Sequence, residues 1–171
     1  VIGTDEPFAI LLGDDLIRGK VPCTAQLIDQ YERHEKSVIG VMEVPDDQVS
    51  KYGIIDGTIQ SKNLYQVKSV VEKPSPNLAP SRLAIPGRYV LSSDVFKYLH
   101  QVQPGKSGEI QLTDGLEKLA QAAGLLAFLF EGERFDTGDR LGYIEATLSY
   151  ALNRDDLRKE TLKLLQKYLQ E

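Results

Sequence analysis

The first segment with side chains suited to chemistry reads FAILLGDD, residues 8–15, where an apolar run leads directly into a glycine and two aspartates. A short apolar run that stops at a turn signal predicts a strand buried on both faces. In open α/β sheets, ligands bind beyond the carboxyl ends of the strands, which is where Asp14 and Asp15 would lie. One of them would hold a divalent metal on a phosphorylated substrate. The alternative is a plain turn, because Gly and Asp both favour turns.

A second candidate is the segment VVEKP, residues 70–74, in which an acid stands beside a base ahead of a proline. Neighbouring residues of a strand point to opposite faces, so Glu72 and Lys73 can share a ligand only where the strand twists or ends. Pro74 favours such an ending. A carboxylate accepts hydrogen bonds from sugar hydroxyls, and an ammonium suits a phosphate. The alternative is a solvated charge pair on an edge strand.

The third candidate is RFDTGDRLGY, residues 134–143, which places Asp136 in a tight turn just before a predicted helix. Its carboxylate could face the same sheet edge as Asp14. The Asp-Thr-Gly triplet also occurs in aspartic proteases, but that chemistry needs two such aspartates sharing a proton, and the chain has one copy. The alternative is that Asp136 and Asp139 are ordinary turn and helix-cap residues.

The residue types favour magnesium over other metals. Asp14 and Asp136 are far apart in the sequence, so they form one site only if the fold brings them together. Mg²⁺ takes hard oxygen ligands and is usually held by one or two carboxylates plus substrate phosphates. His34 and His100 lack metal-ligand spacing, and Cys23 has no paired motif.

Length and composition predict one ordinary globular domain over residues 1–171. The net charge of −5 and the absence of a basic run argue against a nucleic-acid partner, and no apolar stretch is long enough to span a membrane. A single cysteine excludes an intrachain disulfide and suits a reducing compartment, so we expect a cytoplasmic protein. The chain begins with Val1 just before a predicted core strand, so we expect a fragment of a longer polypeptide.

Hydrophobic periodicity predicts alternating strands and helices, and therefore the α/β class. Asp56-Gly57 predicts a two-residue hairpin, so the sheet should be mixed, with flanking helices and a helical end at 139–171. Helices are expected over residues 24–36, 94–102, 109–123 and 139–152, with a last helix beginning at Asp155 or Asp156. Strands are expected over 8–12, 37–44, 52–56, 66–73, 83–91 (kinked at Pro86-Gly87) and 125–130, with a short extended piece at 134–138.

Six segments occur in an order that covers nearly the whole chain: DEPFAILLGDDLI (5–17), KYGIID (51–56), VVEKP (70–74), APSRLAIPGRYVLS (79–92), GEIQLTD (108–114) and FDTGDRLGY (135–143). Together they resemble the bacterial UTP–glucose-1-phosphate uridylyltransferases, which are members of the sugar-nucleotidyltransferase family. The resemblance implies a Rossmann-like α/β fold and a Mg²⁺-dependent reaction. In that reaction glucose 1-phosphate attacks the α-phosphorus of UTP, and UDP-glucose and pyrophosphate are formed.

The resemblance also implies roles for particular residues. Asp14 resembles the catalytic, metal-binding aspartate, and Asp136 resembles the second acidic residue near the metal. On the sugar side, Gly53 resembles the glycine whose backbone approaches the sugar. Glu72 resembles the acceptor for glucose hydroxyls.

Two further residues complete the implied site. Lys73 resembles the catalytic lysine that contacts the phosphates, and Ile85 lies where the family brings backbone near the sugar. The family begins with a glycine-rich loop and basic residues that hold the triphosphate, and this chain has no such segment. We therefore expect the carboxyl-terminal part of a uridylyltransferase, lacking the nucleotide-binding half, inactive by itself, and forming a homo-oligomer through its last helix. The alternatives are a non-catalytic sugar-nucleotide-binding or assembly module, or a related enzyme with another sugar or base, such as a thymidylyltransferase.

Overall fold

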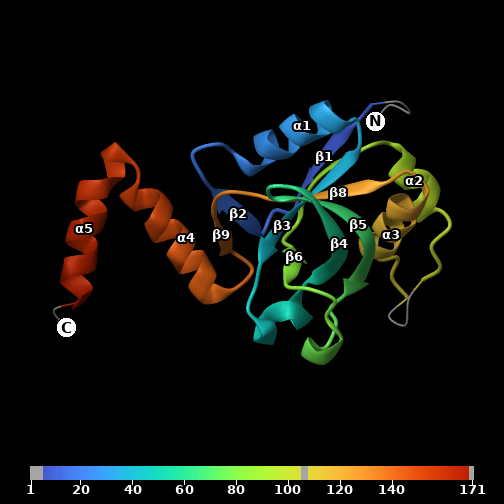
Figure 1. The fold of residues 1–171 in the computed structure, drawn as a ribbon. Helices are drawn as coiled ribbons and strands as arrows, with labels where there is room; N and C mark the ends of the chain where they lie inside the picture. Colours follow the sequence, from blue (N-terminus) through green and yellow to red (C-terminus); the bar gives the residue numbers. More distant parts are fainter. Residues whose placement is uncertain (1–5, 105–107, 170–171) are drawn as a thin grey trace. The chain divides into compact units, whose positions relative to one another are not determined.

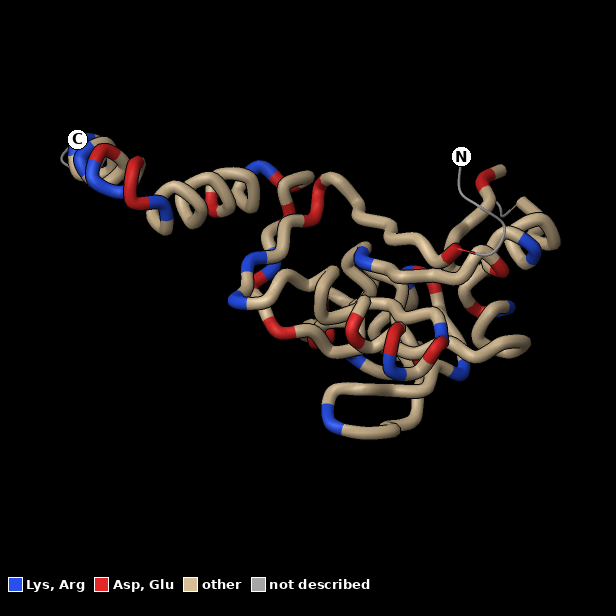
Figure 2. The backbone as a smooth tube through the Cα atoms, turned by 90° about the horizontal axis from the view of Figure 1, so that it is seen from above, with Lys and Arg blue, Asp and Glu red and all other residues tan. Residues whose placement is uncertain are grey.

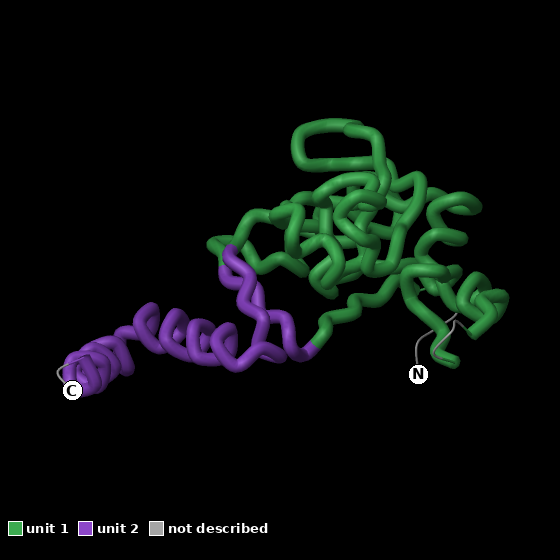
Figure 3. The backbone as a smooth tube through the Cα atoms, turned by 90° about the horizontal axis from the view of Figure 1, so that it is seen from below, with its two compact units in different colours: residues 1–12, 19–132 green, residues 13–18, 133–171 purple. Residues whose placement is uncertain are grey.

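The computed structural model describes residues 6–104 and 108–169 and divides into two compact units (Figures 1 and 3). Unit 1 comprises residues 1–12 and 19–132, and unit 2 comprises residues 13–18 and 133–171. Each unit therefore contains segments that are distant in the sequence. Acidic and basic residues are spread along the chain in both units (Figure 2).

Unit 1 is built on a mixed sheet of seven strands in the order β1-β7-β3-β6-β4-β5-β8, with an additional pairing of β3 and β8. The strands are β1 (Phe8–Leu11), β3 (Ser37–Glu43), β4 (Gly53–Ser61), β5 (Leu64–Glu72), β6 (Leu83–Ile85), β7 (Arg88–Leu91) and β8 (Leu125–Leu129). Only the β3–β8 pairing is parallel among those of the described strands. The predicted α/β class with a mixed sheet is confirmed.

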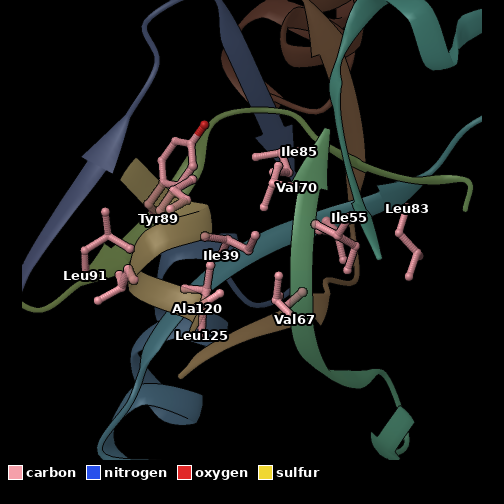
Figure 4. Packing of buried hydrophobic residues seen from close by; sticks show 14 of the residues in the cluster. Ile39, Ile55, Val67, Val70, Leu83, Ile85, Tyr89, Leu91, Ala120 and Leu125 are labelled. Atoms are coloured by element: carbon pink, nitrogen blue, oxygen red, sulfur yellow. The ribbon is translucent and has the colours of Figure 1, made fainter. Parts of the chain in front are cut away.

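The helices and short 3₁₀ segments of unit 1 are α1 (Cys23–His34), η1 (Asp46–Lys51), η2 (Pro76–Leu78), α2 (Asp94–Leu99) and α3 (Leu112–Ala122). Helix α1 packs against β3 and β7, and α3 packs against β5 and β8. Figure 4 shows most of the buried cluster, in which apolar side chains of the strands lie beside Ala120 of α3. Leu116 and Leu119 of the same helix also belong to this cluster. Val38 and Ile39 are both fully buried, and because successive strand residues face opposite ways, β3 is covered on both faces.

Unit 2 is a short antiparallel ribbon followed by two helices. Strand β2 (Asp15–Arg18) pairs with β9 (Glu133–Asp136), and the helices are α4 (Arg140–Leu152) and α5 (Asp155–Leu169). Phe135 of β9 is almost fully buried, with the Tyr150 ring of α4 at a centroid distance of 6.0 Å. The Arg18 guanidinium lies 5.7 Å from the centre of the Phe135 ring and donates to the Ser149 carbonyl oxygen at 3.2 Å. These contacts fix α4 against the ribbon.

Two predictions about strands are wrong. Strand β1 is not buried on both faces: it lies at the end of the sheet order, and Leu11 is 52% exposed. The hairpin does not turn at Asp56-Gly57, where β4 instead continues through a register shift. The turn between β4 and β5 lies at residues 62–63, where Asn63 adopts the left-handed conformation (φ 62°) that asparagine tolerates.

Two further features bear on the predictions. The kink predicted at Pro86-Gly87 is confirmed, because Gly87 has a φ of 112° and separates β6 from β7. No pattern in the sequence predicted β2. Among the described residues, no helix is long and apolar enough to cross a membrane.

Candidate functional site

The ribbon of unit 2 brings Asp14 and Asp136 together. Asp14 lies in the turn before β2, and Asp136 is the last residue of β9. The amide nitrogen and the hydroxyl of Thr137 both donate to the Asp14 carbonyl oxygen, at 2.7 and 2.9 Å. A Cβ placed on Gly138 would lie 3.3 Å from Asp136 Oδ1 and 3.4 Å from Asp14 Oδ2. The two carboxylates therefore flank the same glycine.

Asp14 and Asp15 have different surroundings although they are adjacent. Asp15 is buried, and its side chain forms an ion pair with Arg134. Burial raises the pKa of Asp15, and the hydrogen bond and charge of Arg134 oppose that rise. Asp14 is exposed, and within the part of the chain that the structure describes, no group donates to its carboxylate. Asp14 is therefore the aspartate of this pair with oxygens available to a ligand.

The Asp136 carboxylate is held in a defined orientation. Its Oδ1 accepts from the amides of Gly138 and Asp139 at 3.1 and 3.3 Å, and its Oδ2 lies 3.2 Å from Arg134 Nη2. In the described ranges, no group of three or more His, Cys, Asp or Glu side chains could hold a metal ion. A pair of carboxylates still fits Mg²⁺, because that ion is commonly bound by one or two carboxylates together with substrate phosphates.

Asp139 has a different task from Asp136. Its backbone is extended, and its side chain accepts from the amides of Leu141 and Gly142 at 2.9 and 3.0 Å. These bonds satisfy two of the free N–H groups at the start of α4. Asp139 is thus the helix cap that the sequence left open as an alternative.

A second group of predicted residues lies in unit 1, around Gly53. Gly53 is the first residue of β4 and pairs with Glu72 of β5 on one side and Ile85 of β6 on the other. A Cβ on Gly53 would lie 3.0 Å from Thr113 Cγ2, 3.2 Å from Glu72 Oε2 and 3.5 Å from Ile85 Cδ1. A side chain there would crowd the Glu72 carboxylate, so glycine at this buried position leaves room beside that carboxylate.

The strand ends between Glu72 and Lys73, as it must if these neighbouring side chains are to share a ligand. Strand β5 ends at Glu72, and Lys73 turns into the left-handed region with a φ of 45°. Its amide donates to the Tyr52 carbonyl oxygen at 3.0 Å, and its Nζ lies 3.8 Å from Glu72 Oε1. A non-glycine residue in this conformation costs on the order of 1–3 kcal/mol, and such strain clusters at functional sites.

Thr113 also lies beside Gly53, although the sequence did not predict it as a site residue. It lies in the first turn of α3, and its Oγ1 is the one buried side-chain oxygen or nitrogen without a hydrogen-bond partner among the described residues. An unpaired buried hydroxyl is costly and calls for an explanation such as a ligand. Thr113 belongs to the segment GEIQLTD (108–114) that contributes to the resemblance, but nothing in the sequence gives it a role, because only the fold brings α3 next to Gly53.

Comparisons with known proteins agree with the resemblance predicted from the motifs. A model of the nucleotidyl transferase family matches residues 1–153. The UTP–glucose-1-phosphate uridylyltransferase of Bacillus subtilis (strain 168) is 46% identical over 162 residues, which are 95% of this chain and 56% of that protein. The resemblance is therefore confirmed, and the chain spans little more than half the length of this relative.

Two solved structures have the same fold over most of this chain. A UDP-glucose pyrophosphorylase complexed with UDP-glucose matches with a TM-score of 0.84 and 41% identity, covering 90% of this chain and 59% of that one. A UTP-bound enzyme of the same kind from Acinetobacter baumannii matches with a TM-score of 0.82 and 33% identity, covering 95% and 56%. The sheet and helices described here therefore match part of each larger chain.

The close approach of α4 to β9 predicts an unusual effect of a glycine substitution. Alanine normally stabilises a helix over glycine by about 1 kcal/mol. A Cβ on Gly142, however, would lie 2.0 Å from the Asp136 carbonyl oxygen. Gly142→Ala should therefore lower the free energy of unfolding by about 1–3 kcal/mol, as overpacking does, measured by denaturant titration.

Gly13→Ala is the matched control, because nothing lies within 4 Å of a Cβ at that position. This variant should keep the stability of the unaltered chain. An unchanged or higher stability of Gly142→Ala would contradict the close packing of α4 on β9.

Proposed function

This chain belongs to the nucleotidyl transferase family, and on that premise we propose that it contributes the sugar-binding and metal-binding parts of a UTP–glucose-1-phosphate uridylyltransferase. The reaction joins glucose 1-phosphate to the α-phosphorus of UTP and releases pyrophosphate. The main support for the proposal is the group of residues around Gly53. The Glu72 carboxylate and the Lys73 ammonium lie side by side there, and Thr113, whose hydroxyl has no partner among the described residues, lies beside the same glycine.

The groups around Gly53 suit the hydroxyls of a sugar. The Glu72 carboxylate accepts hydrogen bonds only, and sugar hydroxyls supply the donors. The Thr113 hydroxyl both donates and accepts, and a bound sugar would give it the partner that it lacks within the described residues. Ile85 is buried beside Gly53 and contributes backbone and an apolar wall. One relative of known structure is complexed with UDP-glucose, which contains glucose.

Lys73 suits the phosphates of the same ligand. Its side chain is 62% exposed, and its ammonium lies beside the Glu72 carboxylate where β5 ends. A lysine side chain interacts with phosphate as a compact positive charge. In phosphoryl and nucleotidyl transfer, such charges stabilise the negative charge that develops on the phosphate oxygens.

In unit 2 we assign Mg²⁺ to Asp14 and Asp136. The ion would supply positive charge to phosphate oxygens. Asp14 would offer an exposed carboxylate, and Asp136 a carboxylate whose orientation is set by two backbone amides and by Arg134. Asp15 is left out of this assignment because its carboxylate is buried against Arg134.

The last helix suits contact with a second copy of the chain. Helix α5 exposes Leu164, Tyr168 and Leu169, whose exposed fractions are 55%, 63% and 84%. Apolar side chains gathered on one exposed helix favour association. A homo-oligomer through α5 is therefore part of the proposal, and the cytoplasmic location stays a prediction.

The proposal predicts that this chain by itself does not turn over substrate. It spans about 56% of the length of its B. subtilis relative, and its sequence holds no glycine-rich loop for the triphosphate. Without those donors the charge of the transition state lacks stabilisation. Pyrophosphate release from UTP and glucose 1-phosphate should stay at background with this chain, and should be rapid with the full-length relative as positive control. Rapid release by this chain alone would contradict the proposal.

Glu72→Gln tests the sugar-binding role directly. Hydrogen bonds to a charged group contribute about 1.5–3 kcal/mol, so this variant should bind UDP-glucose at least about tenfold more weakly. The dissociation constant is measured by NMR titration, with the Gly53 amide signal as the reporter. Glu32→Gln, a matched change on the exposed face of α1, should bind as the unaltered chain does. Equal affinities of the two variants would contradict the role of Glu72.

A further inference from the structure

We propose that Arg134 is a positioning residue that fixes the Asp136 carboxylate for metal binding by anchoring it to the buried carboxylate of Asp15. The proposal rests on the metal site assigned above to Asp14 and Asp136. It adds a residue that touches neither metal nor substrate and acts through Asp136. Three observations support it: the geometry of the guanidinium, the difference in burial between its two partners, and the charges gathered at this end of the ribbon.

The guanidinium contacts two carboxylates with two different nitrogens. Its Nε donates to Asp15 Oδ1, and its Nη2 lies 3.2 Å from Asp136 Oδ2. The ribbon places Asp15 directly opposite Asp136, and Arg134 two residues before Asp136 on the same face. A planar guanidinium holds several N–H groups in a fixed arrangement, so the position of one carboxylate determines the position of the other.

Burial makes Asp15 the fixed partner and Asp136 the positioned one. The side chains of Asp15 and Arg134 are 9% and 15% exposed, whereas that of Asp136 is 41% exposed. A buried ion pair with good geometry is costly to break, because breaking it leaves a charge without compensation. Arg134 is thus held from the inside of unit 2 and presents its second nitrogen toward the exposed carboxylate.

Repulsion among the carboxylates makes this anchor necessary. Asp14, Asp15 and Asp136 lie at one end of the ribbon, and like charges directly opposite each other on paired strands are unfavourable. Without the guanidinium, Asp136 Oδ2 would turn away from Asp15 and lose its fixed orientation.

The hydrogen bonds of Asp136 that do not involve Arg134 allow a positioning role of Arg134 to be tested apart from a role in folding. Its Oδ1 accepts from the Gly138 and Asp139 amides, so the turn after β9 keeps these bonds when Arg134 is replaced. Arg134→Lys keeps the positive charge but replaces the planar guanidinium, which contacts both carboxylates, with a single compact ammonium. The change should therefore disturb the orientation of Oδ2 more than it disturbs the fold.

The test measures binding of Mn²⁺ alone to the full 171-residue chain by electron paramagnetic resonance, with thermal unfolding recorded for each variant. Replacing residues that orient a metal ligand typically weakens metal binding 10- to 100-fold. Arg134→Lys and Arg134→Gln should each raise the dissociation constant about tenfold while the chain stays folded. Arg154→Lys is the matched control in the same unit, because Arg154 forms an exposed ion pair with Asp156 and should leave the affinity unchanged.

Asp14→Asn and Asp136→Asn separate this inference from the proposed function. If they weaken Mn²⁺ binding but both Arg134 variants bind as the unaltered chain does, the positioning role is overturned and the metal site stands. If neither aspartate variant weakens binding, or the unaltered chain binds no Mn²⁺, the metal site and the inference both fail. Unfolding of both Arg134 variants would also overturn the positioning role, because Arg134 would then be required for the fold itself.

Discussion

The pairing of β2 with β9 is the interaction on which the proposed metal site depends. It joins residues 15–18 to residues 133–136, and closing so long a stretch of chain has an entropic cost that grows slowly with its length. The burial of Phe135 and its contacts with Arg18 and Tyr150 help to offset that cost. Because the ribbon sets Asp136 opposite Asp15, the register of this single pairing decides which carboxylates meet.

In unit 1 a similar constraint operates through the absence of a side chain. Gly53 lies between β5 and β6, where a Cβ would come within 3.5 Å of side chains from three different elements. The end of β5 and the left-handed turn at Lys73 then place an acid and a base within 3.8 Å of each other. Strand pairing and one strained residue thus bring an acid and a base together beside a buried glycine, which suits the phosphorylated sugar that we propose for this group of residues.

The sequence indicated most of the residues that the structure gathers around Asp14 and around Gly53, but it did not predict their surroundings. The strands and the α/β class follow from local periodicity, but periodicity does not say which strand lies at the edge of the sheet. The prediction that β1 is buried on both faces was therefore wrong, and β3 is a strand that is buried in this way. Asp56-Gly57 resembles a turn, yet cross-strand pairing carried β4 past it to Asn63. The difference between Asp14 and Asp15, and the unpaired hydroxyl of Thr113, arise from tertiary contacts that no local pattern encodes.

We propose that Asp14 and Asp136 together bind the metal ion. Crystals of the chain grown with UDP-glucose and Mn²⁺ would locate the ion by its anomalous scattering. The expected peak lies in direct contact with a carboxylate oxygen of Asp14 and one of Asp136, with a phosphate oxygen among the other ligands. A Mn²⁺ peak coordinated by other side chains, with neither aspartate in contact, would rule out this metal site.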